Sequence, residues 1–235
     1  MDNPKTDISA ITHGGGANHI GGRKPPWILV GLFAASLLLM ALAVKAGVFV
    51  PMDRAVAQGV ETIRTLWLDE GARAITFFGS TVWTLSAMVL MSAWKRRERG
   101  RVPVFWGAWL FGCAVQVLLR LWVAQGRPDA AVVPVGWAAD FLELGTQFHL
   151  AGFPSGHAFR SAFLFGWWAQ GCLRRQGLWE RGIGVGCLVV IVLVGWTRLY
   201  LNRHWLTDVL GSWVLALLSL TLACALRPRQ SAPSP

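Results

Sequence analysis

Three short stretches of this chain combine arginine, histidine and carboxylate side chains, each beside a long apolar segment. The candidate site residues are Arg120 and Arg127, then Ser155, Gly156 and His157, then Arg198, His204 and Asp208. Arginines bind phosphate oxygens, and an imidazole beside a carboxylate can act as a nucleophile or base. Because ionisable groups next to a bilayer are costly, we interpret the set as a functional phosphate site without a metal.

The His204 and Asp208 pair is four residues apart, the spacing of stacked neighbours on a helix. A carboxylate beside an imidazole fixes its tautomer and stabilises its cation. Arg198 ends the preceding apolar run, so a tight loop over residues 199–203 would bring it to the same pocket. A single His–Asp pair is often structural, and this one gains weight from its two companion stretches.

The sequence Pro154-Ser155-Gly156-His157 predicts the start of a helix. Ser155 suits the N-cap position, and free N–H groups at a helix start bind anions. Gly156 allows a ligand to approach the backbone closely, and His157 would stand in the first turn beside that anion. The alternative reading is a simple capping turn.

Arg120 and Arg127 are seven residues apart, so they would share one helix face after two turns. Pro128 disfavours a helical conformation at Arg127, which predicts a helix end near that residue. Taken alone, Arg127 could be an interfacial anchor. Arg120 lies deeper in the apolar run and requires a partner or an aqueous cavity.

The elements that must position these residues are long apolar helices. Of the 235 residues, 54% are hydrophobic and only 14% are charged, which is unusual for a soluble domain. The apolar runs cover residues 27–44, 74–94, 102–119, 161–173, 182–197 and 209–226. The fourth and fifth runs reach the roughly 20 residues of a membrane span only if they include residues 157–160 and 198–201.

We therefore expect an all-α integral membrane protein, a bundle of six transmembrane helices. A single domain would cover residues 27–226. It would lie between a disordered tail at residues 1–26 and a short polar tail at residues 227–235.

The net charge of +10 raises the possibility of nucleic-acid binding, but the charge distribution argues against such a partner. Lys and Arg cluster in both tails, at residues 95–101 and at residues 174–181. The positive-inside rule places these segments in the cytoplasm, as in a bacterial inner membrane. Both termini are then cytoplasmic, and the three chemical stretches face the periplasm or exterior.

Two segments on that outer side have apolar patterns of their own. Within residues 53–70, Val56, Val60, Ile63 and Trp67 predict an amphipathic helix in the membrane interface. The long segment 129–153 contains Trp137, Phe141, Leu142, Leu144, Phe148 and Leu150. It could be a functional lid or an interfacial anchor.

Through these three stretches the sequence resembles the type 2 phosphatidic acid phosphatase superfamily, which also includes vanadium haloperoxidases. The family pattern is Lys, six residues, Arg-Pro; then Pro-Ser-Gly-His; then Ser-Arg, five residues, His, three residues, Asp. Both gapped spacings match, over roughly residues 70–220. This chain departs from the pattern in having Arg120 in place of Lys and Thr197 in place of Ser.

The resemblance implies a role for each matched residue. His204 would attack phosphorus to form a phosphohistidine, Asp208 would orient it, and His157 would protonate the leaving oxygen. Arg120, Arg127, Arg198, Ser155 and the Gly156 amide would hold the phosphoryl oxygens. No cofactor or metal is expected.

Arg160 lies outside the family motif, three residues after His157. It is a candidate contact for a second phosphate of a diphosphate substrate. The alternative is a charge pair with Asp129, Asp140 or Glu143.

The expected function is hydrolysis of a lipid phosphate that enters sideways from the membrane. Undecaprenyl diphosphate is the first choice of substrate. Phosphatidylglycerophosphate, phosphatidate and lipid A phosphate are alternatives, as is phosphotransfer to another lipid. A transporter or scaffold with an anion pocket is the non-enzymatic alternative. A soluble haloperoxidase is disfavoured by the apolar runs, and the sequence does not fix the oligomeric state.

Overall fold

The computed structural model describes residues 26–94, 101–128 and 151–227. Within these residues the chain forms α-helices and one short 3-10 helix. The elements are α1 (Trp27–Lys45), α2 (Val50–Glu61), α3 (Leu66–Thr76), η1 (Phe77–Gly79), α4 (Thr81–Trp94), α5 (Arg101–Val123), α8 (Gly156–Leu173), α9 (Leu178–Tyr200) and α10 (Leu206–Ala225). The predicted tails, apart from Pro26 and Arg227, lie outside the described residues, and so do residues 129–150 of the segment 129–153 that was expected to be a lid or an anchor.

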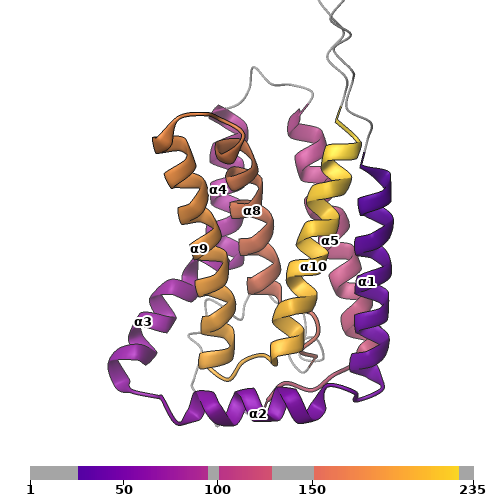
Figure 1. Ribbon diagram of the computed structural model, residues 1–235, viewed down its shortest axis with the longest axis vertical. Helices are drawn as coiled ribbons and strands as arrows, with labels where there is room; N and C mark the ends of the chain where they lie inside the picture. The colour runs from indigo at the N-terminus through magenta and orange to yellow at the C-terminus, as the bar shows by residue number, and fades with distance from the viewer. Residues whose placement is uncertain (1–25, 95–100, 129–150, 228–235) are drawn as a thin grey trace, which may run out of the picture.

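The bundle is built around α8 and α10. Helix α8 packs against α9 and α10, while α10 also packs against α1 and α5. Figure 1 shows these helices running side by side, with α4 alongside, while α2 lies across one end of the bundle. The N-terminal ends of α8 and α10 lie at the end crossed by α2, and so do the C-terminal ends of α5 and α9.

By length and composition, fewer of the described helices could span a membrane than the six that were predicted. Among the described residues, α1, α5, α9 and α10 qualify, and the bent pair Leu66–Gly79 and Thr81–Ala93 gives a fifth if it is one span. Helix α8 does not qualify, because its 18 residues include His157, Arg160 and Gln170. The all-helical, multi-pass architecture agrees with the expectation, and the count of six is not confirmed.

The outer surface of the bundle suits a lipid environment. Large apolar side chains on α1 are exposed, among them Leu32, Leu38 and Leu39. Inside, small residues let helices approach closely, as is common in membrane bundles. A Cβ at Gly112 on α5 would collide with the Phe159 ring of α8.

The predicted amphipathic helix over residues 53–70 is two helices, α2 and α3. The break at residues 62–65 is stabilised from the core, because the Tyr200 hydroxyl accepts a hydrogen bond from Thr65 N–H at 3.0 Å. The same hydroxyl donates to Thr65 O at 3.3 Å. A helical pattern in sequence does not reveal such a tertiary contact, so the expectation of one continuous helix was wrong.

Candidate active site

His204 and Asp208 meet at the start of α10. The helix begins at Leu206, so His204 precedes it and Asp208 lies in its first turn. Asp208 Oδ2 accepts a hydrogen bond from Trp205 N–H at 3.0 Å and lies 3.1 Å from His204 Nδ1. The predicted contact is present, but the two residues do not stack on one helix. The carboxylate instead reaches back across the helix start, as in a capping box.

The imidazole of His204 is in a buried and electropositive environment, with 4% of the residue exposed. Burial first, and then the guanidinium groups of Arg198, Arg127 and Arg120, lower its pKa well below the ordinary value. His204 is therefore neutral at pH 7. In the tautomer in which Nδ1–H donates to Asp208 Oδ2, the lone pair of the ring is on Nε2.

Arg198 lies in the last turn of α9, as predicted, and it also shapes the loop that carries His204. Its carbonyl oxygen accepts hydrogen bonds from Arg203 N–H at 3.0 Å and from His204 N–H at 3.2 Å. The loop is further tightened at Asn202, which has a φ of 53°. The side chain of Arg198 donates to Thr76 Oγ1 at 3.0 Å, which ties α9 to α3.

Arg120 and Arg127 do not share a helix face. Helix α5 ends at Val123, and Ala124 adopts a left-handed conformation with a φ of 52°. Beyond that turn, Gly126 pairs with Ala151 in an isolated β-bridge. The helix ends earlier than Pro128 suggested because the following residues pair with the chain that leads into α8. Both arginines still act on His204.

The segment from Pro154 to His157 forms the start of α8, as predicted. Ser155 occupies the N-cap position, and its N–H donates to Asp208 O at 3.1 Å. Ser212 Oγ donates to Ser155 O at 2.8 Å. These bonds hold the N-terminal ends of α8 and α10 together. They thereby connect the first turn of α8, which contains His157, to the start of α10, which His204 precedes.

The hydroxyl of Ser155 does not cap the helix. Ser155 is fully buried, and its Oγ has no hydrogen-bond partner among the described residues. A buried hydroxyl without a partner is costly, so this oxygen is suited to contact a bound ligand.

Gly156 lies where three polar side chains converge. A Cβ at this position would lie 3.0 Å from Arg160 Nη1, 3.0 Å from Gln116 Nε2 and 3.4 Å from Arg120 Nη2. The glycine is therefore needed for space around these side chains. Arg120 is 7% exposed, and its Nε donates to Pro154 O at 3.3 Å.

Arg160 contacts the first turn of its own helix. Its Nη2 lies 3.4 Å from His157 Nδ1, and its Nε donates to Gly79 O at 3.0 Å. The residues considered as acidic partners, Asp129, Asp140 and Glu143, lie outside the described residues. The structure thus places the Arg160 guanidinium directly beside His157, the candidate general acid.

Three further residues support the site and were missed in the sequence. Gln116 donates to Pro154 O at 3.2 Å, Thr76 accepts from Arg198, and Asp53 on α2 binds Thr207 of α10. Gln116 was recognisable as a polar residue one turn before Arg120 in an apolar run. No sequence signal marked Thr76 or Asp53, because both act across long chain separations.

The arrangement can perform chemistry on a phosphate ester. A neutral imidazole held by a carboxylate is a nucleophile, and guanidinium groups can stabilise the negative charge of a transferring phosphoryl group. A second histidine at a helix start can exchange protons. All these groups lie at one end of a membrane-spanning bundle.

Comparison with known proteins agrees with this chemistry. The family model of the PAP2 superfamily matches residues 110–232, which contain all three motifs. The chain belongs to the PAP2 superfamily, and it is a multi-pass membrane lipid phosphatase.

Its similarity extends to characterised bacterial enzymes. Phosphatidylglycerophosphatase B of Bacillus subtilis (strain 168) is 27% identical over 190 residues, covering 77% of this chain and 86% of the relative. The crystal structure of a transmembrane PAP2 type phosphatidylglycerolphosphate phosphatase from Bacillus subtilis aligns with a TM-score of 0.67 at 25% identity. That alignment covers 85% of this chain and 94% of the solved one.

Proposed function

We propose that this lipid phosphatase hydrolyses phosphatidylglycerophosphate through a phosphohistidine on His204. The buried contact between His204 and Asp208, 3.1 Å apart, supports the mechanism. The similarity to phosphatidylglycerophosphatase B supports the substrate. Undecaprenyl diphosphate, the expectation from sequence, has no support among the relatives and becomes the second substrate to test.

In the proposed reaction, His204 Nε2 attacks phosphorus while Asp208 holds the proton on Nδ1. The P–O bond to the lipid breaks as His157 gives a proton to the leaving oxygen. Water then attacks the phosphohistidine, with His157 accepting its proton, and inorganic phosphate leaves. The first step uses the proton of His157 and the lone pair of His204, and the second step restores both.

Arg120, Arg127 and Arg198 hold the phosphoryl oxygens, helped by Ser155 and the Gly156 amide. Phosphoryl transfer depends mainly on positioning and on stabilising charge at the equatorial oxygens. The buried Ser155 hydroxyl, which lacks a hydrogen-bond partner among the described residues, is suited to this role.

Arg160 supports the diphosphate alternative. Its guanidinium is 3.4 Å from His157 Nδ1, so it lies near the proposed leaving oxygen, where a second phosphate would be. If this is its role, Arg160→Ala lowers hydrolysis of a diphosphate lipid more than hydrolysis of a monophosphate lipid. An equal loss on both substrates would instead assign Arg160 to the support of His157.

The substrate is tested with purified protein in detergent. Phosphate release is measured for phosphatidylglycerophosphate, undecaprenyl diphosphate, phosphatidate and lipid A at equal concentration. We expect the highest kcat/KM for phosphatidylglycerophosphate. A higher value for undecaprenyl diphosphate would overturn the substrate proposal and leave the phosphohistidine mechanism in place.

The nucleophile is tested by His204→Ala, which should lower kcat by about 10³-fold or more, as expected for loss of a nucleophile. His19→Ala, at a histidine that none of the three motifs contains, is the matched control and should keep full activity. In rapidly quenched wild-type protein, labelled substrate should leave an acid-labile, alkali-stable phosphate on the chain. Turnover by the His204 variant at the wild-type rate would contradict the mechanism.

We also propose that residues 27–226 form the membrane domain, with the site facing the periplasm or exterior of a bacterial inner membrane. Both termini would then be cytoplasmic. The clusters of Lys and Arg in every second loop support this orientation.

A further inference from the structure

A second cavity lies at the end of the bundle opposite the histidines. Its volume is about 430 Å³, and α4, α5, α8 and the chain after α10 surround it. Helix α8 passes both sites, from Gly156 at the active site to Gln170 at the cavity. At 1.5 Å per residue, these positions are about 20 Å apart, so the cavity is separate from the phosphate site.

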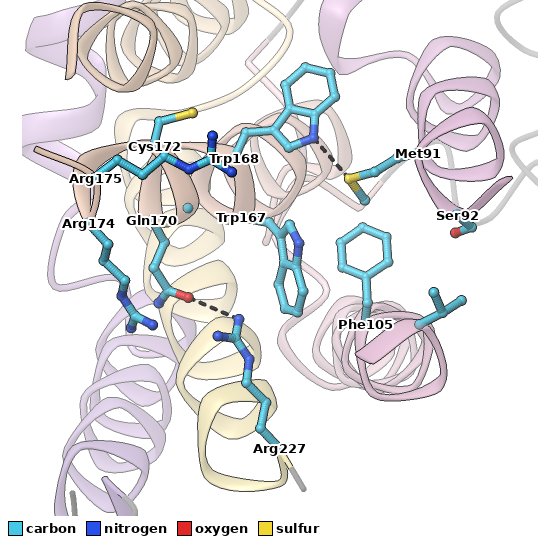
Figure 2. Close-up of a pocket in the computed structure, with 12 residues that line it drawn as sticks. Met91, Ser92, Phe105, Trp167, Trp168, Gln170, Cys172, Arg174, Arg175 and Arg227 are labelled. Atoms are coloured by element: carbon cyan, nitrogen blue, oxygen red, sulfur yellow. Dashed lines mark hydrogen bonds between the residues drawn. The ribbon is translucent and has the colours of Figure 1, made fainter. Parts of the chain in front are cut away.

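One wall of the cavity is apolar and aromatic. The rings of Phe105 on α5 and Trp167 on α8 have centroids 4.7 Å apart. Trp168 donates from Nε1 to the sulfur of Met91 on α4 at 2.9 Å, as Figure 2 shows. Since α4 packs on α8 while α5 packs on α10, the cavity lies between two helix pairs.

The rim of the same cavity is cationic. Arg174, Arg175 and Arg227 line it, and none of the described lining residues is acidic. The Arg227 guanidinium lies over the Trp167 ring, 4.6 Å from its centroid, and donates to Gln170 Oε1 at 3.1 Å. Figure 2 shows how these contacts place it at the edge of the aromatic wall. Arg227 is thus held in place where it can meet an anion.

We infer that this basic pocket, formed by Arg174, Arg175, Arg227 and the wall of Phe105 and Trp167, binds an anionic glycerophospholipid. Guanidinium groups grip phosphate through paired hydrogen bonds, while the aromatic wall covers the glycerol and first acyl carbons. A soluble anion would leave that wall without a ligand, and a neutral lipid would not complement the positive charge of the rim.

The position in the membrane fits this ligand. The pocket is at the end of the bundle that carries Arg174, Arg175 and Arg227, and the positive-inside rule assigns such a basic end to the cytoplasmic leaflet. That leaflet carries anionic lipids that attract clustered Lys and Arg. The inferred lipid is a ligand of the basic pocket and is separate from the substrate, which binds at the active-site end.

Native mass spectrometry of the purified full-length protein tests the inference, with phosphatidylglycerol and phosphatidylcholine as probes. The triple variant R174Q/R175Q/R227Q removes the cationic rim. The triple variant R54Q/R64Q/R73Q removes three charges near the opposite end and is the matched control. We expect wild type and control to retain phosphatidylglycerol equally, and the rim variant to retain about tenfold less.

The remaining outcomes are also decisive. Equal retention by both triple variants would overturn the inference, and so would equal retention of phosphatidylcholine and phosphatidylglycerol by wild type. Displacement of the lipid by millimolar glycerol phosphate would show a site for the headgroup alone. Because Arg175 is exposed, the single variant Arg175→Gln should fold normally and show a partial loss, even if the triple variant is unstable.

Discussion

The imidazole of His204 depends on its surroundings for its protonation state. Burial and three guanidinium groups keep it neutral at pH values where a free imidazole would be protonated. Arg198 contributes twice, because its side chain lowers that pKa and its carbonyl oxygen holds the His204 backbone. The candidate nucleophile and its electrostatic environment are thus built from the same few residues.

This low pKa makes stability depend on pH in a predictable direction. Below about pH 6.5 the unfolded state binds a proton at His204 that the folded state does not. Stability should therefore fall with decreasing pH, by up to about 1.4 kcal/mol for each pH unit below 6.5. Thermal unfolding in detergent from pH 7.5 to 5.5 checks this. His204→Gln should show a smaller decrease, and an unchanged decrease would contradict the assignment.

Among the helices, α2 is coupled to the site through the side chain of Asp53. Asp53 is 3% exposed, and its carboxylate accepts from Thr207 N–H at 3.0 Å and from Thr207 Oγ at 2.7 Å. Thr207 is the second residue of α10, so Asp53 satisfies one of the free N–H groups at that helix start. Asp208 follows in sequence, which links the helix lying across the bundle to the candidate nucleophile.

Asp53→Asn should lower the free energy of unfolding by about 1–3 kcal/mol, because one of two charge-assisted hydrogen bonds is lost in a buried site. It should also lower kcat, since the start of α10 carries Asp208. The measurement pairs thermal unfolding with phosphate release. Glu70→Gln, at an exposed carboxylate on α3, is the control and should change neither quantity.

Helix crossings should be sensitive to side-chain size at Gly112 but not at Gly107. Both glycines are on α5, yet only a Cβ at Gly112 meets Phe159 and Ser219, while a Cβ at Gly107 has open space. Gly112→Ala should destabilise the protein by about 1–3 kcal/mol through overpacking. Gly107→Ala should be neutral or slightly stabilising. Equal melting temperatures for the two variants would show that α5 does not cross α8 as described.

For the molecule as a whole, the two ends of the bundle differ in chemistry. The end crossed by α2 (Figure 1) holds the candidate active site, and the residues that line the basic pocket lie toward the opposite end. The N-terminal end of α1 and the C-terminal end of α10 lie at the end of the bundle opposite α2. If both proposals hold, the reaction takes place in one leaflet and the anionic lipid is bound in the other.

The orientation can be measured with single cysteines in a variant lacking the four native ones. Arg54→Cys on α2, which crosses the active-site end, should react with a membrane-impermeant maleimide in intact cells. Arg175→Cys, at the opposite end, should react only after the cells are opened. The reverse pattern would place the site in the cytoplasm and contradict the proposed topology.

The sequence by itself determined the class of this protein and the identity of its candidate site residues. Apolar runs of membrane length, alternating charge clusters and three spaced motifs are local properties, so they can be read without a fold. The helix start at Gly156 followed from the same local rules. The family match at residues 110–232 agrees with that reading.

The tertiary structure decided how those residues meet. It ended α5 at Val123. It also divided the predicted amphipathic helix near Thr65, whose backbone N–H and carbonyl oxygen both form hydrogen bonds with the Tyr200 hydroxyl. It also brought Asp53 to Thr207, 154 residues away in the chain. Such contacts depend on which helices pack together, and packing is set by shape and burial over the whole bundle, which no short sequence pattern encodes.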